Sequence, residues 1–531
     1  MKGDFLLQLY SLQFVAFLCL SLAAYFALGR IAPRCQWTVL LAASLGFYVC
    51  TGWHNLFFIL LTAGSSWAVG MAFGKLEERS KAARKAASDR AEKKEIKARF
   101  NHYKWLALLA ALVLNFGVLS YIKYWNVLLD GLGIGGSFLA SSLLLPLGLS
   151  FYTFQSMGYL IDAYNGKVAP ERNPLKYLLF VSWFPQLIQG PINRFDQLAE
   201  QLCAPRRFDG AGAKRALLLI GFGMLKKFVV ADMLVETIAA CLDQVTPGTP
   251  GSVIVFGILL YSAQQYGDFS GGIDMVRGVS QLFGVRMAEN FRQPYFSVSL
   301  GDFWRRWHIT LGAWMRDYVF YPFALRPSMR RLGEWCSAHL GHHAGRTLPA
   351  CVANILVFFL VGLWHGAEAH YIWWGLYNGL VIAAADLAAP LFARMKAAFR
   401  VNDATNAWHA WRVARTFVVV NVGWYFDRIY DFGDCLQAFH NTLFNFNAGG
   451  FYTALVGLHI PNIKICLLIA AVGCVVVFVV SVLRERGVDV TERVLALPFM
   501  VRVVVISIML LFVAFSFAFA PSQGGFIYAN F

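Results

Sequence analysis

The chain has 531 residues, of which 58% are hydrophobic and only 14% are charged, whereas about a quarter of the residues in an ordinary soluble domain carry charge. This composition excludes a water-soluble globular protein. Because apolar runs recur from Phe5 to the C-terminus, we expect a single membrane domain over residues 1–531 rather than several soluble domains. A net charge of +16 could indicate binding to nucleic acid, and the position of the charge along the chain decides whether it does.

Positive charge is concentrated in one stretch near the N-terminus. Between Lys75 and Lys104 there are eleven basic and five acidic residues. Short segments rich in Lys and Arg stay on the cytoplasmic side of a membrane and favour anionic lipid head groups. We therefore predict a basic cytoplasmic loop over residues 75–104 that sets the orientation of the protein. The lipid bilayer is the expected partner, and nucleic acid is not.

The apolar runs predict transmembrane helices. A helix needs about 20 mostly apolar residues to cross a bilayer, and about twelve runs are candidates by length and periodicity. The first, Phe5 to Leu28, is longer than the core of a cleaved signal peptide and precedes Arg30 and Arg34, so we expect a retained span. Other runs, such as Leu175 to Pro191, are interrupted by Pro and Gly. These features predict an all-α polytopic membrane protein with some broken helices.

Carboxylates, arginines and tryptophans are packed together between Gly267 and Pro322. One interpretation is a belt at the depth of the lipid head groups, where Trp, Tyr and Arg are enriched. The other is the wall of a polar cavity, in which Arg305, Arg306 and Arg316 could bind an anionic cofactor by bidentate contacts to phosphate. The residues alone leave both interpretations open.

His365 follows an apolar run and lies between Gly362 and Gly366. An ionisable residue at such a position is costly unless it faces a cavity or a partner, so it is a functional candidate. The alternative is a core histidine whose ring nitrogens are satisfied by backbone carbonyls. The two glycines favour the functional interpretation, because they would leave the ring open to close approach by a substrate.

The chemistry of a buried imidazole narrows its function. A near-neutral imidazole can take the proton from a hydroxyl that attacks a thioester, and no metal is needed. Such a histidine in a low-dielectric tunnel suits acyl transfer between a donor on one face and an acceptor on the other. His308 could then position the donor or acceptor, or assist electrostatically. Arg316 and Asp317 could organise the tunnel wall.

At these residues the sequence resembles the membrane-bound O-acyltransferase superfamily, and specifically its bacterial polysaccharide branch. The resemblance rests on motifs in a shared order: Ser150 to Gln155, Phe184 to Pro191, Asp268 to Asp274, Phe303 to His308, Arg316 to Tyr318, and Trp364 to Gly366. It implies a ring of tilted and broken helices around a central funnel and tunnel. His365 matches the catalytic histidine of the family, and His308 matches its other histidine.

The resemblance also implies an activity and a division of the chain. We expect transfer of an acyl group, most simply acetyl, from a cytoplasmic thioester to hydroxyls of an extracytoplasmic cell-surface polysaccharide, directly or through an esterase-like partner protein. The donor would be acetyl-CoA or an acyl carrier protein, with no tightly bound cofactor and no metal. N-terminal spans (1–145), a catalytic core (146–380) and C-terminal spans (381–531) would lie in the cytoplasmic membrane of a bacterium. The residues expected to bind the donor are Arg305, Arg306, Arg316, Asp317, Trp307 and Trp364.

Other functions stay open at this point. The related teichoic acid branch transfers D-alanine from a small carrier protein, and the chain departs from the alginate branch by placing Asp427 between Phe426 and Arg428. A transporter or flippase of a lipid-linked glycan could use the same helices and a buried histidine without any acyl donor, and an inactive scaffold would need neither.

Overall fold

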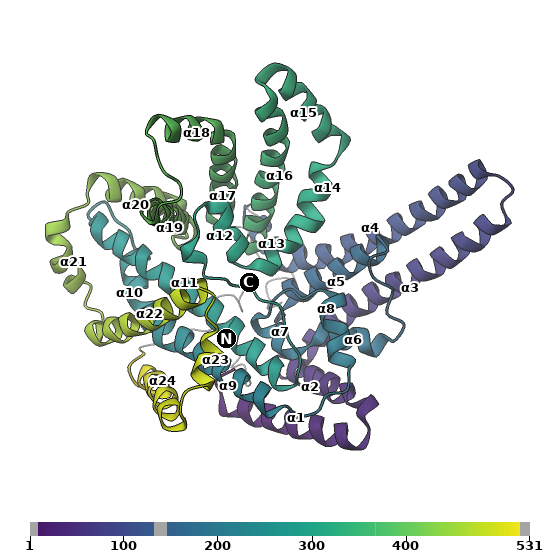
Figure 1. Cartoon of the computed structure of the whole chain (residues 1–531), viewed down its shortest axis with the longest axis horizontal. Helices are drawn as coiled ribbons and strands as arrows, with labels where there is room; N and C mark the ends of the chain where they lie inside the picture. Colours follow the sequence, from purple (N-terminus) through teal and green to yellow (C-terminus); the bar gives the residue numbers. More distant parts are fainter. Residues whose placement is uncertain (1–8, 132–145, 367, 521–531) are drawn as a thin grey trace. The chain divides into compact units, whose positions relative to one another are not determined.

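The computed structural model describes residues 9–131, 146–366 and 368–520 (Figure 1). Within those ranges the regular elements are helices, and the one extended feature is an isolated antiparallel bridge between Phe291 and Trp307. The prediction of an all-α polytopic membrane protein is confirmed.

The contacts divide the chain into two compact units, and the first comprises described residues 9–220 and 275–288. Its helices are α1 (Leu12–Ile31), α2 (Trp37–Val49), α3 (Leu56–Ala86), α4 (Arg90–Gly131), α5 (Leu149–Tyr164), α6 (Pro174–Ser182), α7 (Phe184–Gln189), α8 (Phe195–Cys203) and most of α9 (Gly210–Met224). Short 3₁₀ turns at Pro33–Cys35 and Trp53–Asn55 precede α2 and α3.

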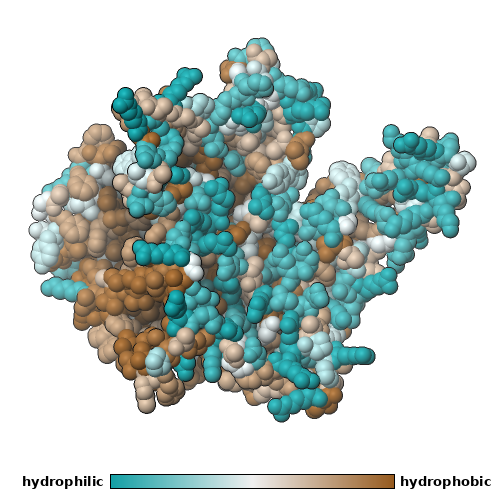
Figure 2. All heavy atoms as spheres, viewed as in Figure 1, coloured by the Kyte–Doolittle hydropathy of each residue, from teal (hydrophilic) through white to brown (hydrophobic). Residues whose placement is uncertain are grey.

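The stretch predicted as a basic loop is instead a helical hairpin. Helices α3 and α4 continue through residues 75–86 and 90–104, pack along each other, and leave only a short turn between them (Figure 1). Lys104 forms an ion pair with Glu77 across the hairpin. The stretch is helical because Ala, Glu, Lys and Arg are strong helix formers even where a segment is too polar to lie in lipid, and its place on the cytoplasmic side stays a prediction. Hydrophilic residues cover the outer end of the hairpin (Figure 2).

The interrupted run in the first unit forms the expected broken helices. Helix α6 ends at Ser182, and α7 begins two residues later with Pro185 in its first turn. Every residue of α7 is buried, and amide side chains supply its polar partners: Gln186 Nε2 donates to Gln155 Oε1 at 2.9 Å. Helix-breaking backbone is thus enclosed by protein, as a membrane interior requires.

The second unit comprises described residues 221–274 and 289–520. Its elements are a π-helix (Leu225–Asp232), α10 (Met233–Leu242), most of α11 (Gly251–Leu282), α12 (Leu300–Arg306), α13 (Ile309–Met315), a second π-helix (Arg316–Phe320), α14 (Tyr321–Ala324), α15 (Pro327–Leu340), α16 (His342–His365), α17 (Ala369–Leu387), α18 (Ala389–Ala398), α19 (Asn406–Arg428), α20 (Phe432–Phe444), α21 (Phe451–Gly457), α22 (Ile463–Glu485), α23 (Val490–Leu495) and α24 (Phe499–Phe519). Single 3₁₀ turns lie at Pro294–Phe296 and Ala448–Gly450.

Six helices in the described part of the chain are long and apolar enough to cross a membrane, and the bent pair α17 and α18 could make a seventh span. The six are α1, α3, α4, α16, α22 and α24. Exposed apolar side chains on α22, such as Val475 and Phe478, form a hydrophobic surface (Figure 2). Helices α5, α11 and α19 are each shorter or carry more polar residues than these six.

Candidate active site

His308 lies at a break between two short helices of the second unit. Helix α12 ends at Arg306, α13 begins at Ile309, and His308 has a left-handed backbone with φ of 47°. A neighbouring segment pairs with this break, since Ile309 N donates to Asn290 O at 3.0 Å and Arg292 N donates to Arg306 O at 2.9 Å. A non-glycine residue in this conformation costs about 1–3 kcal/mol and persists where its surroundings hold it firmly, often at functional sites.

The imidazole of His308 is held from several sides. Its Nδ1 lies 3.1 Å from Asn290 Oδ1, which also accepts from Thr310 N at 3.0 Å and from Thr310 Oγ1 at 2.9 Å. The ring of Phe269, on α11, meets the imidazole edge to face with 4.9 Å between the ring centroids. His308 lies outside the helices that span the membrane, and burial lowers its pKa to about 3. The ring is therefore neutral at physiological pH.

His365 is the last residue of α16, and it is buried among aromatic rings. The imidazole stacks on Tyr371 at 5.7 Å between centroids, and it meets Trp374 edge to face at 5.1 Å. The C-terminal end of a helix carries partial negative charge from its last carbonyl groups, which favours a cation there. His365 therefore lies at the negative end of the α16 dipole.

The glycines beside His365 have a packing function that differs from the one the sequence suggested. A Cβ on Gly362 would lie 2.4 Å from Tyr371 O, and one on Gly375 would lie 2.4 Å from Phe358 O. Helices α16 and α17 therefore touch backbone to backbone. A Cβ on Gly366 would lie 2.5 Å from the ring of Tyr371. These close contacts bring α17 against His365, and the expected opening for a substrate is not what the glycines provide.

Trp364 brings the two histidines into one neighbourhood. Its ring centroid lies 4.9 Å from that of His365 and 6.1 Å from that of His308. A second connection runs through Trp304 of α12, whose ring meets Trp374 edge to face at 5.3 Å. The sequence therefore predicted a pair of histidines, 57 positions apart in the chain, that the fold places beside the same indole.

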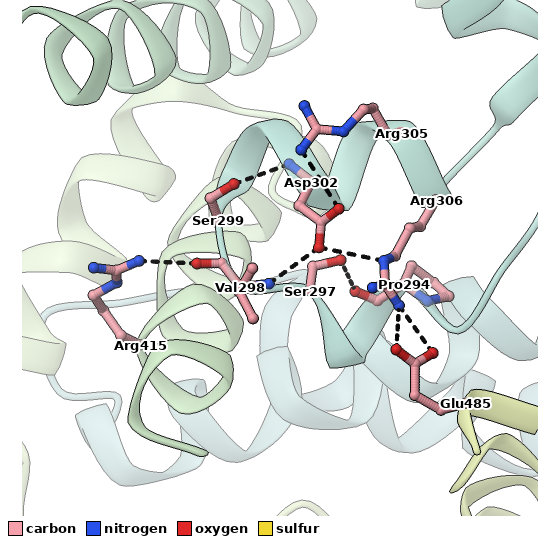
Figure 3. A network of polar contacts seen from close by, with 9 residues as sticks. All are labelled: Pro294, Ser297, Val298, Ser299, Asp302, Arg305, Arg306, Arg415 and Glu485. Carbon is pink, nitrogen blue, oxygen red and sulfur yellow. Dashed lines mark hydrogen bonds and ion pairs between the residues drawn. The ribbon is translucent and has the colours of Figure 1, made fainter. Parts of the chain in front are cut away.

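The arginines on α12 differ in their surroundings (Figure 3). Arg306 Nη1 lies 2.9 Å from both carboxylate oxygens of Glu485 on α22, and its Nε lies 3.3 Å from Asp302 Oδ2. Arg305 makes one longer contact, 3.5 Å to Asp302 Oδ1, and its side chain is 73% exposed. Arg306 thus joins α12 to α22, whereas most of the guanidinium of Arg305 remains accessible to an anion.

The other expected donor-binding residues are spread along the same segment. Arg316 is exposed and pairs with its neighbour, Nε to Asp317 Oδ1 at 2.9 Å. Trp307 is 2% exposed, and its ring stacks on Phe303 at 5.4 Å and meets Phe291 edge to face at 5.0 Å. Trp307 is therefore part of the packed core under the His308 break, while Arg316 and Asp317 lie nearer the surface.

The carboxylates of α11, which the sequence placed in the same polar stretch, form buried ion pairs. Lys226 Nζ lies 2.7 Å from Asp274 Oδ2, and Lys227 Nζ lies 2.5 Å from Asp268 Oδ1 and 2.8 Å from Asp232 Oδ1. The π-helix makes this possible, since its i to i+5 spacing brings Asp232 beside Lys227. These pairs fix α11 to the π-helix on either side of Phe269, the residue that contacts His308.

Sequence reasoning missed several residues of this site. Asn290 lies in the polar stretch between Gly267 and Pro322, but nothing in that stretch indicates its contact with His308. No sequence motif indicates His370. Its Nδ1 lies 3.0 Å from Phe426 O, and its ring centroid lies 3.9 Å from that of Tyr371. Asp427 was noted only as a departure, and it is buried, accepting from Tyr261 Oη at 2.7 Å and from Gln265 Nε2 at 3.1 Å.

The fold and the site define a class of protein: a polytopic α-helical membrane protein with two buried histidines. One histidine, His308, lies at a helix break, and the other, His365, lies at a helix end. The profile of the membrane-bound O-acyltransferase family matches residues 170–423. The probable alginate O-acetylase AlgI of Pseudomonas aeruginosa is 33% identical to this chain over 417 residues, 77% of this chain and 69% of that protein.

Two further relatives act on other polymers. The peptidoglycan O-acetyltransferase of Helicobacter pylori is 30% identical over 363 residues, 62% of this chain and 63% of that protein. The teichoic acid D-alanyltransferase of Bacillus subtilis is 30% identical over 243 residues, 44% of this chain and 58% of that protein. The chain belongs to the membrane-bound O-acyltransferase family and is an O-acyltransferase.

Proposed function

We propose that this enzyme transfers an acetyl group from a thioester at the cytoplasmic face of a bacterial cytoplasmic membrane to hydroxyls of an extracytoplasmic cell-surface polysaccharide. The observation that carries the proposal is that the rings of His308 and His365 both lie beside the indole of Trp364. The names of the alginate and peptidoglycan relatives support acetyl as the group and a surface polymer as the acceptor.

His365 acts as the general base. It takes the proton of the attacking hydroxyl while the hydroxyl oxygen bonds to the carbonyl carbon of the thioester, the carbon–sulfur bond breaks, and the proton passes to the departing sulfur. The helix end stabilises the intermediate imidazolium. His308 positions the reacting groups. Its burial supports this assignment, because a neutral ring in a dry site orients a polar partner strongly.

The donor is acetyl-CoA or an acetylated acyl carrier protein, and both carry the thioester at one end of a pantetheine arm whose other end is a phosphate. Arg305 is the best placed of the expected residues to contact phosphate, because its side chain is exposed and only weakly paired. Arg316 and Asp317 organise the neighbouring surface, and Trp364 contacts the thioester end. Arg306 and Trp307 support the site through packing and ion pairing.

The proposal includes the orientation of the protein in the membrane and the route by which the acetyl group reaches the polysaccharide. The basic residues of the α3–α4 hairpin favour the cytoplasmic side. Residues 146–380 form the catalytic core between N-terminal spans (1–145) and C-terminal spans (381–531). The acetyl group reaches the polysaccharide directly or through an extracytoplasmic, esterase-like partner protein. D-alanyl transfer from a carrier protein is the alternative, and it is weaker because the D-alanyltransferase of B. subtilis aligns with 44% of this chain against 77% for the alginate relative.

Purified protein in lipid nanodiscs, given radiolabelled acetyl-CoA and deacetylated polysaccharide, tests the proposal. We expect labelled polysaccharide with the wild type, and a loss of at least about a hundredfold with His365→Ala, in the range of general acid–base catalysis. His339→Ala is the matched control, because His339 is an exposed histidine of α15 that stacks on Trp335. Label from D-alanyl carrier protein alone would favour the teichoic acid reaction, and glycan movement without transfer of label would favour a transporter.

A further inference from the structure

The hydrogen-bond partners of Asn290 determine which nitrogen of His308 carries the proton. The backbone N–H of Thr310 can only donate, so the Asn290 atom that it faces at 3.0 Å is the carbonyl oxygen Oδ1. That oxygen can only accept, so His308 Nδ1, at 3.1 Å, must be the donor. In a neutral imidazole only one ring nitrogen carries hydrogen. His308 is therefore the Nδ1–H tautomer, and its Nε2 is a hydrogen-bond acceptor.

We propose that Asn290 is a positioning residue for acyl transfer, which holds His308 as a neutral Nδ1–H tautomer so that Nε2 accepts a hydrogen bond from a second hydroxyl of the acceptor sugar, next to the one that attacks. This inference rests on the proposed function, in which His308 positions a reacting group. His308 Nε2 then orients the acceptor through a hydroxyl that does not react, while His365 takes the proton of the hydroxyl that attacks, so the two histidines act on different groups of the acceptor.

The main chain of Asn290 supports the same assignment. Its carbonyl oxygen accepts from Ile309 N at 3.0 Å, directly after the left-handed His308. Asn290 thus holds both the backbone and the ring of His308. The left-handed backbone of His308 is unfavourable for a histidine, and it is retained because Asn290 holds both the main chain and the side chain there.

The amide of Asn290 also has a feature that stability alone does not explain. Asn290 is fully buried, and its Nδ2 makes no hydrogen bond to any residue that the structure describes. A buried donor without a partner costs stability. A neutral side chain with an acceptor oxygen is nevertheless what the Nδ1–H tautomer needs, and a carboxylate there would instead favour a protonated ring.

The elements known to pack on the imidazole of His308 include α11 through Phe269, α16 through Trp364, and the segment that carries Asn290. The titratable residue beside Phe269 is Asp268, which pairs with Lys227. The titratable residue beside Trp364 is His365, which contacts aromatic rings.

The test measures the tautomer and the pH profile separately. In protein labelled with ¹⁵N-histidine in nanodiscs, the His308 resonances are assigned by their loss in His308→Gln. We expect a protonated Nδ1 and an unprotonated Nε2 in the wild type down to pH 5, and a loss of that preference in Asn290→Leu. In Asn290→Asp we expect the acid limb of kcat/KM to move to higher pH by about one to three units, the shift that an adjacent opposite charge produces.

Thr310→Val is the matched control, because it removes one hydroxyl donor to Asn290 and leaves the contact with His308 in place. It should keep both the tautomer and the pH profile. The proposal is overturned by an Nε2–H tautomer in the wild type, or by superimposable profiles for the wild type and Asn290→Asp. The near-isosteric Asn290→Asp variant covers the case in which Asn290→Leu does not fold. The NMR result does not depend on acyl transfer, so it stands even if the proposed activity is absent.

Discussion

The indole of Trp364 lies 6.1 Å from the imidazole of His308 and is adjacent in sequence to His365. One ring therefore sets the separation of the two histidines. Trp364→Leu should lower kcat about ten- to a hundredfold, because small misplacements of reacting groups cost that much. Steady-state kinetics of acetyl transfer measures the effect. Trp335→Leu, which removes an exposed indole on α15, should leave kcat unchanged, and equal losses in both variants would exclude a spacing function for Trp364.

The two arginines of α12 should separate in their effects. Arg305→Ala should raise KM for the thioester donor about tenfold with little change in stability, since an exposed charge that contacts phosphate contributes about 1.5–3 kcal/mol. Donor titrations at fixed acceptor concentration measure KM. If the KM of Arg305→Ala equals that of the wild type, Arg305 does not contact the donor.

Arg306→Ala should act on stability instead. Removing it leaves Glu485 and Asp302 without their shared cation, so we expect a loss of about 1–3 kcal/mol. Thermal unfolding in detergent compares this variant with Arg305→Ala. A greater loss of stability in Arg305→Ala would contradict the pairing shown in Figure 3.

The buried pair between Lys226 and Asp274 should behave as a unit. Lys226→Met leaves a carboxylate in a site with little access to water and should cost about 3–5 kcal/mol, whereas Lys226→Met combined with Asp274→Leu should recover most of that loss. Thermal unfolding and size-exclusion profiles of the two variants measure it. A double variant less stable than the single variant would show that the two charges do not depend on each other.

The neutral state of His308 should make stability depend on pH. Its folded pKa, about 3, lies below the ordinary value of 6.5, so the unfolded chain takes up a proton first as the pH falls. The stability from neutral burial is complete above pH 6.5 and declines as the pH falls from there toward 3. Thermal unfolding is measured at pH 7.5 and 5.5. The loss of stability between these pH values should be smaller in His308→Gln than in the wild type, and in His339→Gln it should equal that of the wild type.

Local patterns in the sequence predicted the helices, the polytopic class and the two histidines, because hydropathy and short motifs depend on neighbouring residues. Long-range partners could not be predicted. Nothing in the α12 sequence indicates that Arg306 pairs with Glu485, 179 positions away. The charge between Lys75 and Lys104 predicts a segment outside the membrane, but charge alone does not distinguish a loop from the helical hairpin that the structure shows.

The glycines around His365 illustrate a second limit. A glycine beside a candidate base can serve a substrate or a helix contact, and only the partner helix decides between them. Here Gly362 meets the backbone of α17. Asn290 is the same kind of case, because it contacts His308, 18 positions further along the chain, and no sequence pattern indicates that contact.

The most direct test of the central claim is transfer of labelled acetyl from a thioester to polysaccharide by purified protein carrying His365→Ala, beside the wild type and His339→Ala. We expect the wild type and His339→Ala to acetylate the polymer at similar rates, and we expect His365→Ala to transfer no acetyl group to it. Acetylation by His365→Ala at the wild-type rate would contradict it.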